Sequence, residues 1–105
     1  MLLSGITSVG EFHYVHHQPD GTPYEDSLVM SKALVQAAKD SGIRLTILRT
    51  VYLHGGFKQP LEAHQKRFAD RDIDKAIEEL AKLKIFCAQA KDSKIDWGFS
   101  GHSVR

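Results

Sequence analysis

One cysteine and no long apolar run set the first limits on this sequence of 105 residues. A lone thiol, Cys87, cannot form a bridge within the chain, so a disulfide-stabilised scaffold is excluded. The opening Met1-Leu2-Leu3 runs directly into Ser4-Gly5, without the basic region and apolar stretch that a signal peptide requires. We therefore expect a cytoplasmic chain that makes no membrane contact.

Charge of one sign is also lacking. Lysine and arginine number 14, aspartate and glutamate number 13, and the net charge is +1. Such a chain has no general attraction for phosphate backbones, so nucleic acid is not expected as a partner. Apolar residues at 42% and charged residues at 26% are typical of globular proteins and argue against disorder, collagen and coiled coils. The length is sufficient for one small core.

Turn residues and apolar periodicity divide the chain into alternating strands and helices. Segments rich in β-branched and aromatic residues predict strands, and apolar residues spaced three and four apart predict helices. The expected strands are 7–15, 43–53 and 94–99, and the expected helices are 26–41 and 73–87. Asp26 or Ser27 is the expected N-cap of the first helix, Asp70 that of the second, and Gly42 ends the first.

This β-α-β-α-β order predicts an α/β fold with parallel strands, because strands joined by crossover helices run in the same direction. Three strands are too few to close a barrel. They could form a small open sheet, but the abrupt start of the sequence and its stop soon after the third strand favour a piece of something larger. Ligands of parallel α/β folds lie beyond the carboxyl ends of the strands. Five of the six histidines follow the expected strands there, together with other polar residues. The main candidates are Glu11, His13, Tyr14, His16, His17, Arg49, Tyr52, His54, Ser100, His102, Ser103 and Arg105.

The histidine-rich segment 11–17 does not predict a zinc site. In an extended chain His13 and His17 share a face with Glu11, whereas Tyr14 and His16 point the other way. A closed zinc site needs four converging ligands. Polar lining of a pocket, or a hydrogen-bonded structural role, is the expected function of these histidines.

The last five residues partly match a nucleophile elbow. Arg105 stands where that motif has its closing glycine, which argues against a nucleophilic Ser103. The planar guanidinium of Arg105 can instead hold a carboxylate or phosphate through two parallel hydrogen bonds. A solvated arginine is the alternative. Cys87 falls on the apolar stripe of the second helix and is expected in the core.

Several strings along the chain resemble the metal-dependent amidohydrolase superfamily. They are Gly5-Ile6-Thr7-Ser8-Val9, Glu11-Phe12-His13-Tyr14-Val15-His16-His17, Gly42-Ile43-Arg44-Leu45-Thr46 and His102-Ser103-Val104-Arg105. The second string is the most specific, and it is similar to the branch that acts on N-formimino-L-glutamate. The resemblance implies that residues 1–105 are part of a TIM-like (β/α)8 barrel domain. It further implies a zinc-dependent hydrolase of histidine degradation that yields N-formyl-L-glutamate and ammonia.

By the same resemblance Tyr14, His102 and Arg105 match residues that hold the small-molecule substrate. The superfamily's metal ligands and its acid/base residues have no counterpart in this sequence, so neither catalytic residues nor zinc ligands are expected within it. The resemblance also implies a homodimer for the full-length enzyme. Two alternatives remain open: a deaminase of guanine-like or other heterocyclic amines, and a non-catalytic α/β module that self-associates through its open sheet edges.

Overall fold

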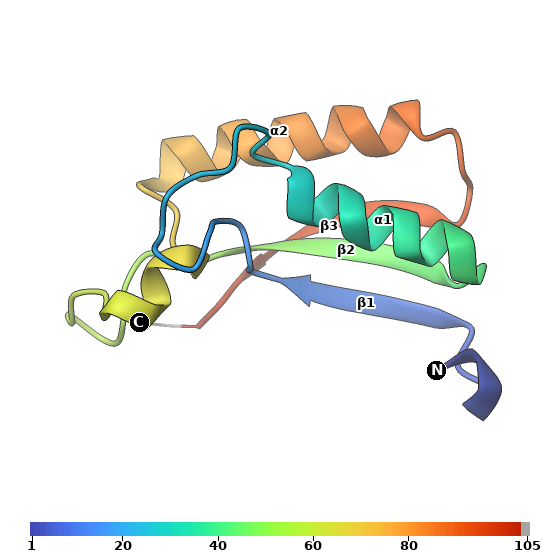
Figure 1. Ribbon diagram of the computed structural model, residues 1–105, viewed down its shortest axis with the longest axis horizontal. Helices are drawn as coiled ribbons and strands as arrows, with labels where there is room; N and C mark the ends of the chain where they lie inside the picture. Colours follow the sequence, from blue (N-terminus) through green and yellow to red (C-terminus); the bar gives the residue numbers. More distant parts are fainter. Residues whose placement is uncertain (104–105) are drawn as a thin grey trace.

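The computed structural model describes residues 1–103 and has the alternating order that the sequence predicts (Figure 1). A short 3-10 helix, η1, precedes the first strand, and a longer one, η2, precedes the second helix. In chain order the elements are η1 (Leu2–Ser4), β1 (Ser8–His13), α1 (Val29–Ser41), β2 (Arg44–Val51), η2 (Ala63–Phe68), α2 (Ile73–Gln89) and β3 (Ile95–Gly101).

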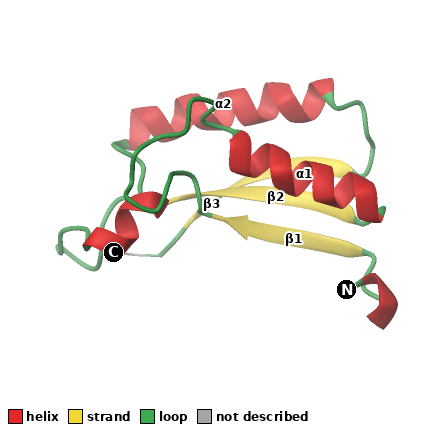
Figure 2. Cartoon of the chain, in the orientation of Figure 1, coloured by secondary structure: helices red, strands yellow, loops and turns green. Residues whose placement is uncertain are grey.

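The three strands form one parallel sheet in the order β1-β2-β3. This confirms the predicted parallel topology, although β1 stops at His13, two residues before the expected end, and β3 continues to Gly101, two residues beyond it. Both long helices lie on the same face of the sheet (Figure 2). The carboxyl ends of all three strands therefore meet at one edge of an open sheet.

The core lies between that face and the helices. Its centre is formed by Ile47 of β2 and Leu83 of α2, both with no exposed surface. Cys87 is buried in the same cluster, as predicted. The other buried members are Leu28, Val35, Ala38, Ile43, Leu45 and Ile95. Because these residues come from α1, α2 and the strands, the core fixes the helices to the sheet and sets the positions of the strand ends.

The opposite face of the sheet carries no helix within residues 1–103 (Figure 1). Leu48 of β2 lies there between two glycines of the flanking strands. A Cβ atom on Gly98 would come within 2.7 Å of Leu48 Cδ2, and one on Gly10 within 3.8 Å of Leu48 Cδ1. Both glycines thus leave room for the leucine to lie across the sheet.

The helix ends differ in part from expectation. Gly42 ends α1 with φ of 80°, a left-handed conformation that glycine adopts readily, as predicted. The N-cap of α2, however, is Asp72, whose side chain accepts a hydrogen bond from the Lys75 amide at 2.8 Å. The prediction that Asp70 caps this helix is wrong, because the Asp70 carboxylate binds Arg49 instead.

The first helix begins three residues later than predicted, at Val29. Its N-cap position is occupied by Leu28, which offers no side-chain hydrogen bond. Asp26 instead accepts a bond from the Leu28 amide at 3.0 Å, and so stabilises the turn that leads into the helix.

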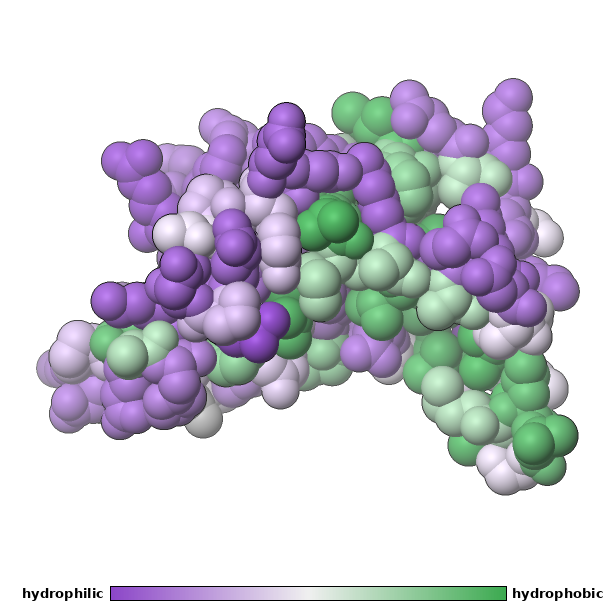
Figure 3. Space-filling view, in the orientation of Figure 1, coloured by the Kyte–Doolittle hydropathy of each residue, from purple (hydrophilic) through white to green (hydrophobic). Residues whose placement is uncertain are grey.

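Exposed apolar residues gather at the N-terminus. Met1, Leu2, Leu3 and Ile6 project from the body of the chain, as the hydropathy colouring shows (Figure 3). Gly5, with φ of 87°, closes the 3-10 turn that carries the first three. Within residues 1–103 no helix combines the length and apolar character needed to cross a bilayer.

Candidate functional site

Five rings meet at the carboxyl edge of the sheet and form what we call the aromatic cluster: Phe12, Tyr14, Tyr52, Phe68 and His102. The His102 ring lies at its centre. Its centroid is 4.5 Å from that of Tyr52 and 5.4 Å from that of Tyr14. Such edge-to-face contacts stabilise a fixed arrangement of rings. Tyr14 follows β1 directly and His102 follows β3 directly, so strand pairing brings them together.

The main chain also holds His102 in place, because its amide donates a hydrogen bond to the Val51 carbonyl at 3.0 Å. The strand pairing thus continues one residue past β3. The ring of His102 is half-buried, and its Nδ1 lies 3.3 Å from the Ser103 hydroxyl. An imidazole in this position can donate a hydrogen bond to a ligand beyond the sheet edge, or accept one from it.

A cavity of about 300 Å³ opens beside His102, at the ends of β2 and β3. Tyr52, His54, Phe99 and Ser103 contribute to its wall. Tyr14 is not one of the lining residues, but its ring contacts that of His102, which is. The volume is at the lower end of the range for small-molecule sites.

The structure therefore unites two of the three residues predicted to hold substrate, Tyr14 and His102. Arg105, the third, lies outside the described residues. His54 lies at the same edge as His102, in agreement with the rule that placed polar residues after strands. Sequence reasoning did not single out Phe68, which comes from η2 and contacts Tyr14 at 5.2 Å.

The side chains of the histidine-rich segment 11–17 are not arranged on the two faces that the sequence predicts. His13 and His16 were predicted on opposite faces, yet their rings meet edge to face at 5.1 Å, and both residues are buried. The alternation fails because β1 ends at His13 and the chain turns there. His16 Nε2 then donates a hydrogen bond to the Thr50 carbonyl at 3.1 Å. These imidazoles pack against the end of β2 rather than beside Tyr14.

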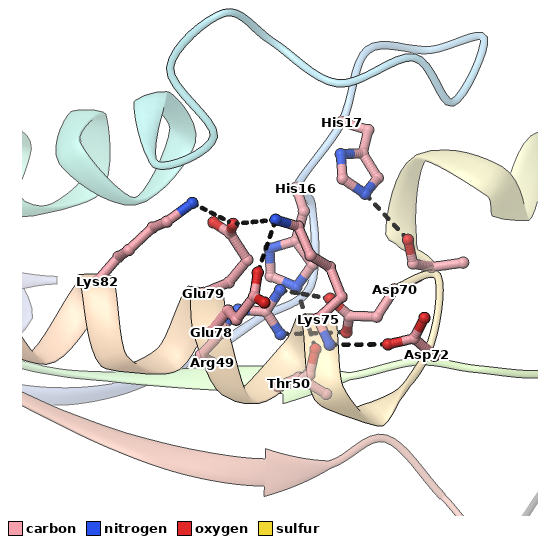
Figure 4. Close-up of polar contacts among 11 residues, drawn as sticks. His16, His17, Arg49, Thr50, Asp70, Asp72, Lys75, Glu78, Glu79 and Lys82 are labelled. Carbon is pink, nitrogen blue, oxygen red and sulfur yellow. Dashed lines mark hydrogen bonds and ion pairs between the residues drawn. The ribbon is translucent and has the colours of Figure 1, made fainter.

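A buried ion pair lies next to these histidines (Figure 4). Both Arg49 nitrogens of the guanidinium fork donate to Asp70: Nη1 to Oδ2 at 3.1 Å and Nη2 to Oδ1 at 2.5 Å. The two side chains are only 4% and 2% exposed. Sequence reasoning counted Arg49 among the polar residues after the strands, but it did not find its partner 21 residues away.

Burial and the nearby positive charges keep both histidines neutral. Burial, and then the neighbouring His16 and Arg49, lower the pKa of His13 from 6.5 to about 4. Burial, and then Arg49, likewise lower the pKa of His16 to about 4. His13 Nε2 has no hydrogen-bond partner among the described residues. Neutral imidazoles next to a buried guanidinium avoid adding further positive charge to the site.

These residues do not fit a zinc site. Among residues 1–103 no group of three or more histidine, cysteine, aspartate or glutamate side chains could hold a metal ion. Asp70 is engaged by Arg49, and His16 by the Thr50 carbonyl. The chemistry that this edge can supply is hydrogen bonding and orientation of a ligand by Tyr14 and His102.

Both the fold and the sequence are similar to those of one class of protein. A crystal structure of an amidohydrolase from Brucella melitensis matches all of this chain with a TM-score of 0.90 and 34% sequence identity. The match covers 23% of that protein. The chain is therefore similar in sequence and fold to part of an amidohydrolase, which confirms the resemblance and the expected segment of a barrel-type α/β fold.

A curated relative narrows the similarity within this class. The chain is 40% identical over 106 aligned residues to the formimidoylglutamate deiminase of Pseudomonas aeruginosa PAO1. The alignment covers all of this chain and 22% of the relative, so the chain spans between a fifth and a quarter of the length of both proteins. No family model matches the chain.

Proposed function

We propose that this chain is part of a (β/α)8 barrel hydrolase that converts N-formimino-L-glutamate into N-formyl-L-glutamate and ammonia. The main support is the 40% identity to a formimidoylglutamate deiminase over the entire chain. The meeting of Tyr14 and His102 at the carboxyl edge of the sheet agrees with it, because barrel enzymes bind substrates at that edge.

The proposed role of the chain is to bind and orient the substrate. The substrate has two carboxylates and a planar formimino group, so it needs both anion recognition and directed hydrogen bonds. The guanidinium of Arg105 is suited to the carboxylates because its fork forms two charge-assisted hydrogen bonds. The Tyr14 phenol and the His102 imidazole supply further hydrogen bonds. Fixing the substrate in this way lowers the entropic part of the barrier.

Residues 1–103 contain no group of three or more histidine, cysteine, aspartate or glutamate side chains that could hold a metal ion. By the resemblance, the proposal assigns the zinc ligands, and the acid and base of the reaction, to residues outside this chain. The proposal also keeps the cytoplasmic location expected from the sequence and the homodimer implied by the resemblance. Analytical ultracentrifugation of the full-length protein tests the homodimer.

Steady-state ammonia release by the full-length protein tests this function. Replacing Arg105 with Met keeps the length of the side chain but removes the fork. We expect kcat/KM for N-formimino-L-glutamate to fall by roughly 30-fold to nearly a thousandfold, which corresponds to about 2 to 4 kcal/mol. Arg71→Met is the matched control, because the Arg71 side chain is 89% exposed. Its kcat/KM should equal that of the parent.

Substrate choice separates the alternatives. Release of ammonia from guanine or another neutral heterocycle, with none from N-formimino-L-glutamate, would favour the heterocycle deaminase. Near-normal kcat/KM in Arg105→Met would remove Arg105 from the site. A 105-residue chain that by itself folds cooperatively and forms an assembly of one size in solution would support the non-catalytic module.

A further inference from the structure

The short segment 67–70 carries Phe68 of the aromatic cluster and is bound from three sides. The Arg67 carbonyl accepts hydrogen bonds from the His16 and His17 amides, at 3.2 and 3.0 Å. His17 Nε2 donates to the Ala69 carbonyl at 3.0 Å (Figure 4). The loop that follows β1 is thus joined to the segment that precedes α2.

Two bonds fix the same segment to β2 and to the residue that follows it. The Asp70 amide donates to the Tyr52 carbonyl at 2.9 Å. The Asp70 carboxylate binds the Arg49 fork, and both side chains are nearly fully buried. Among the contacts that residues 1–103 make with this segment, the ion pair is the one between full charges. Two parallel bonds between planar groups also fix orientation as well as distance.

Phe68 depends on this anchorage because it lies two residues before Asp70. Its ring contacts Tyr14 at 5.2 Å and Tyr52 at 6.1 Å, edge to face in both cases. The same two tyrosines hold the ring of His102. The Phe68 ring, which comes from η2, therefore contacts the same two tyrosine rings that contact His102.

We propose that Arg49 and Asp70 are positioning residues whose buried ion pair holds Phe68 against Tyr14 and Tyr52, and so fixes the substrate-facing rings of Tyr14 and His102. Neither residue touches the substrate. This inference rests on the proposed function for one point, that Tyr14 and His102 bind the substrate. The arrangement of the rings follows from the contacts given above, whatever molecule binds there.

Fluorine NMR of the full-length protein labelled with 3-fluorotyrosine tests the ring arrangement without substrate. The Tyr14→Phe variant assigns the Tyr14 resonance by its loss. Phe68→Leu removes the ring that contacts Tyr14, and Asp70→Asn removes the charge that binds Arg49. Both should shift the Tyr14 resonance. Asp26→Asn is the matched control, because the Asp26 carboxylate forms an exposed ion pair with Lys32 at 2.7 Å. It should leave that resonance unchanged.

Kinetics supply the second measurement. Misplacing the substrate-holding rings should lower kcat/KM for N-formimino-L-glutamate by about tenfold to a hundredfold in Phe68→Leu and Asp70→Asn, mainly through a higher KM. Asp26→Asn should retain the parent value. A merely structural role would instead lower the amount of folded enzyme, which reduces the apparent kcat and leaves KM unchanged.

Arg49→Lys covers the case in which Asp70→Asn does not fold, because lysine keeps the charge but not the fork. An unchanged Tyr14 resonance in Phe68→Leu would overturn the inference. An unchanged resonance in folded Asp70→Asn, or in Arg49→Lys where the former does not fold, would also overturn it. If the parent protein fails to release ammonia from N-formimino-L-glutamate, the proposed function fails, and the fluorine spectra still decide whether the ion pair positions the rings.

Discussion

Acid should weaken this fold through two particular side chains, His13 and His16. Both are buried, and burial and the neighbouring charge of Arg49 lower the pKa of each from 6.5 to about 4. The groups that act on His16 also include Asp70, which raises its pKa, and His17, which lowers it. Between pH 6.5 and 4 the unfolded chain binds these protons and the folded chain does not.

The sign and size of the effect follow from this difference. Stability is fully present above pH 6.5 and declines as the pH falls toward 4, because the unfolded state gains protons first. From pH 7.5 to 5, a group with these two pKa values loses about 2 kcal/mol of unfolding free energy. The two rings together should therefore account for about 4 kcal/mol of the decline.

Urea unfolding at a series of pH values measures this decline. In the double variant His13→Leu, His16→Gln no imidazole titrates at either position, and the glutamine amide can still donate to the Thr50 carbonyl. Its unfolding free energy should fall by about 4 kcal/mol less than that of the parent between pH 7.5 and 5. His64→Gln removes an imidazole that is 71% exposed and should follow the parent curve. Equal declines in the parent and the double variant would refute the reasoning.

Three further measurements test the fold and the metal assignment. Leu83→Ala empties a fully buried core position and should lower the unfolding free energy by about 2 to 5 kcal/mol in urea; a loss below about 1 kcal/mol would contradict the packing. Gly55→Ala places a Cβ against the Pro60 carbonyl and 2.6 Å from Gln65 Oε1, so Tm should fall, and an unchanged Tm would mean that the turn differs. Native mass spectrometry of the 105-residue chain should find no stoichiometric zinc, and a zinc ion lost on His13→Leu would contradict this.

Local signals in the sequence are sufficient for the order of elements and for the edge at which polar residues gather. Periodicity identifies α1 and α2, and parallel crossover then places Tyr14 and His102 at the same end of the sheet. Only the order of the strands in the chain is needed for this inference. Strand ends shift by one to two residues because pairing with a neighbour, rather than local composition, decides where a strand stops.

Contacts between distant segments leave no such local signal. Judged from its sequence neighbours alone, Asp70 is well suited to cap a helix. Its carboxylate binds the buried guanidinium of Arg49 instead, because a buried charge without a partner is costly. Asp72 then caps α2 instead. His16 was misplaced for a related reason: the rule of alternating faces applies only while the chain is extended, and β1 ends three residues before it.

The two faces of β1 explain why the site has both an aromatic and a charged part. Phe12 lies on the face without helices, and Tyr14 contacts it at 5.7 Å, so the aromatic cluster forms there. His13, between them in sequence, is buried on the helix side and contacts His16. Segment 67–70 contributes to both parts, since Phe68 enters the cluster and Asp70 enters the ion pair. A change in the ion pair can therefore reach the rings of Tyr14 and His102 through two residues of main chain, whereas a change in the aromatic cluster need not disturb the ion pair.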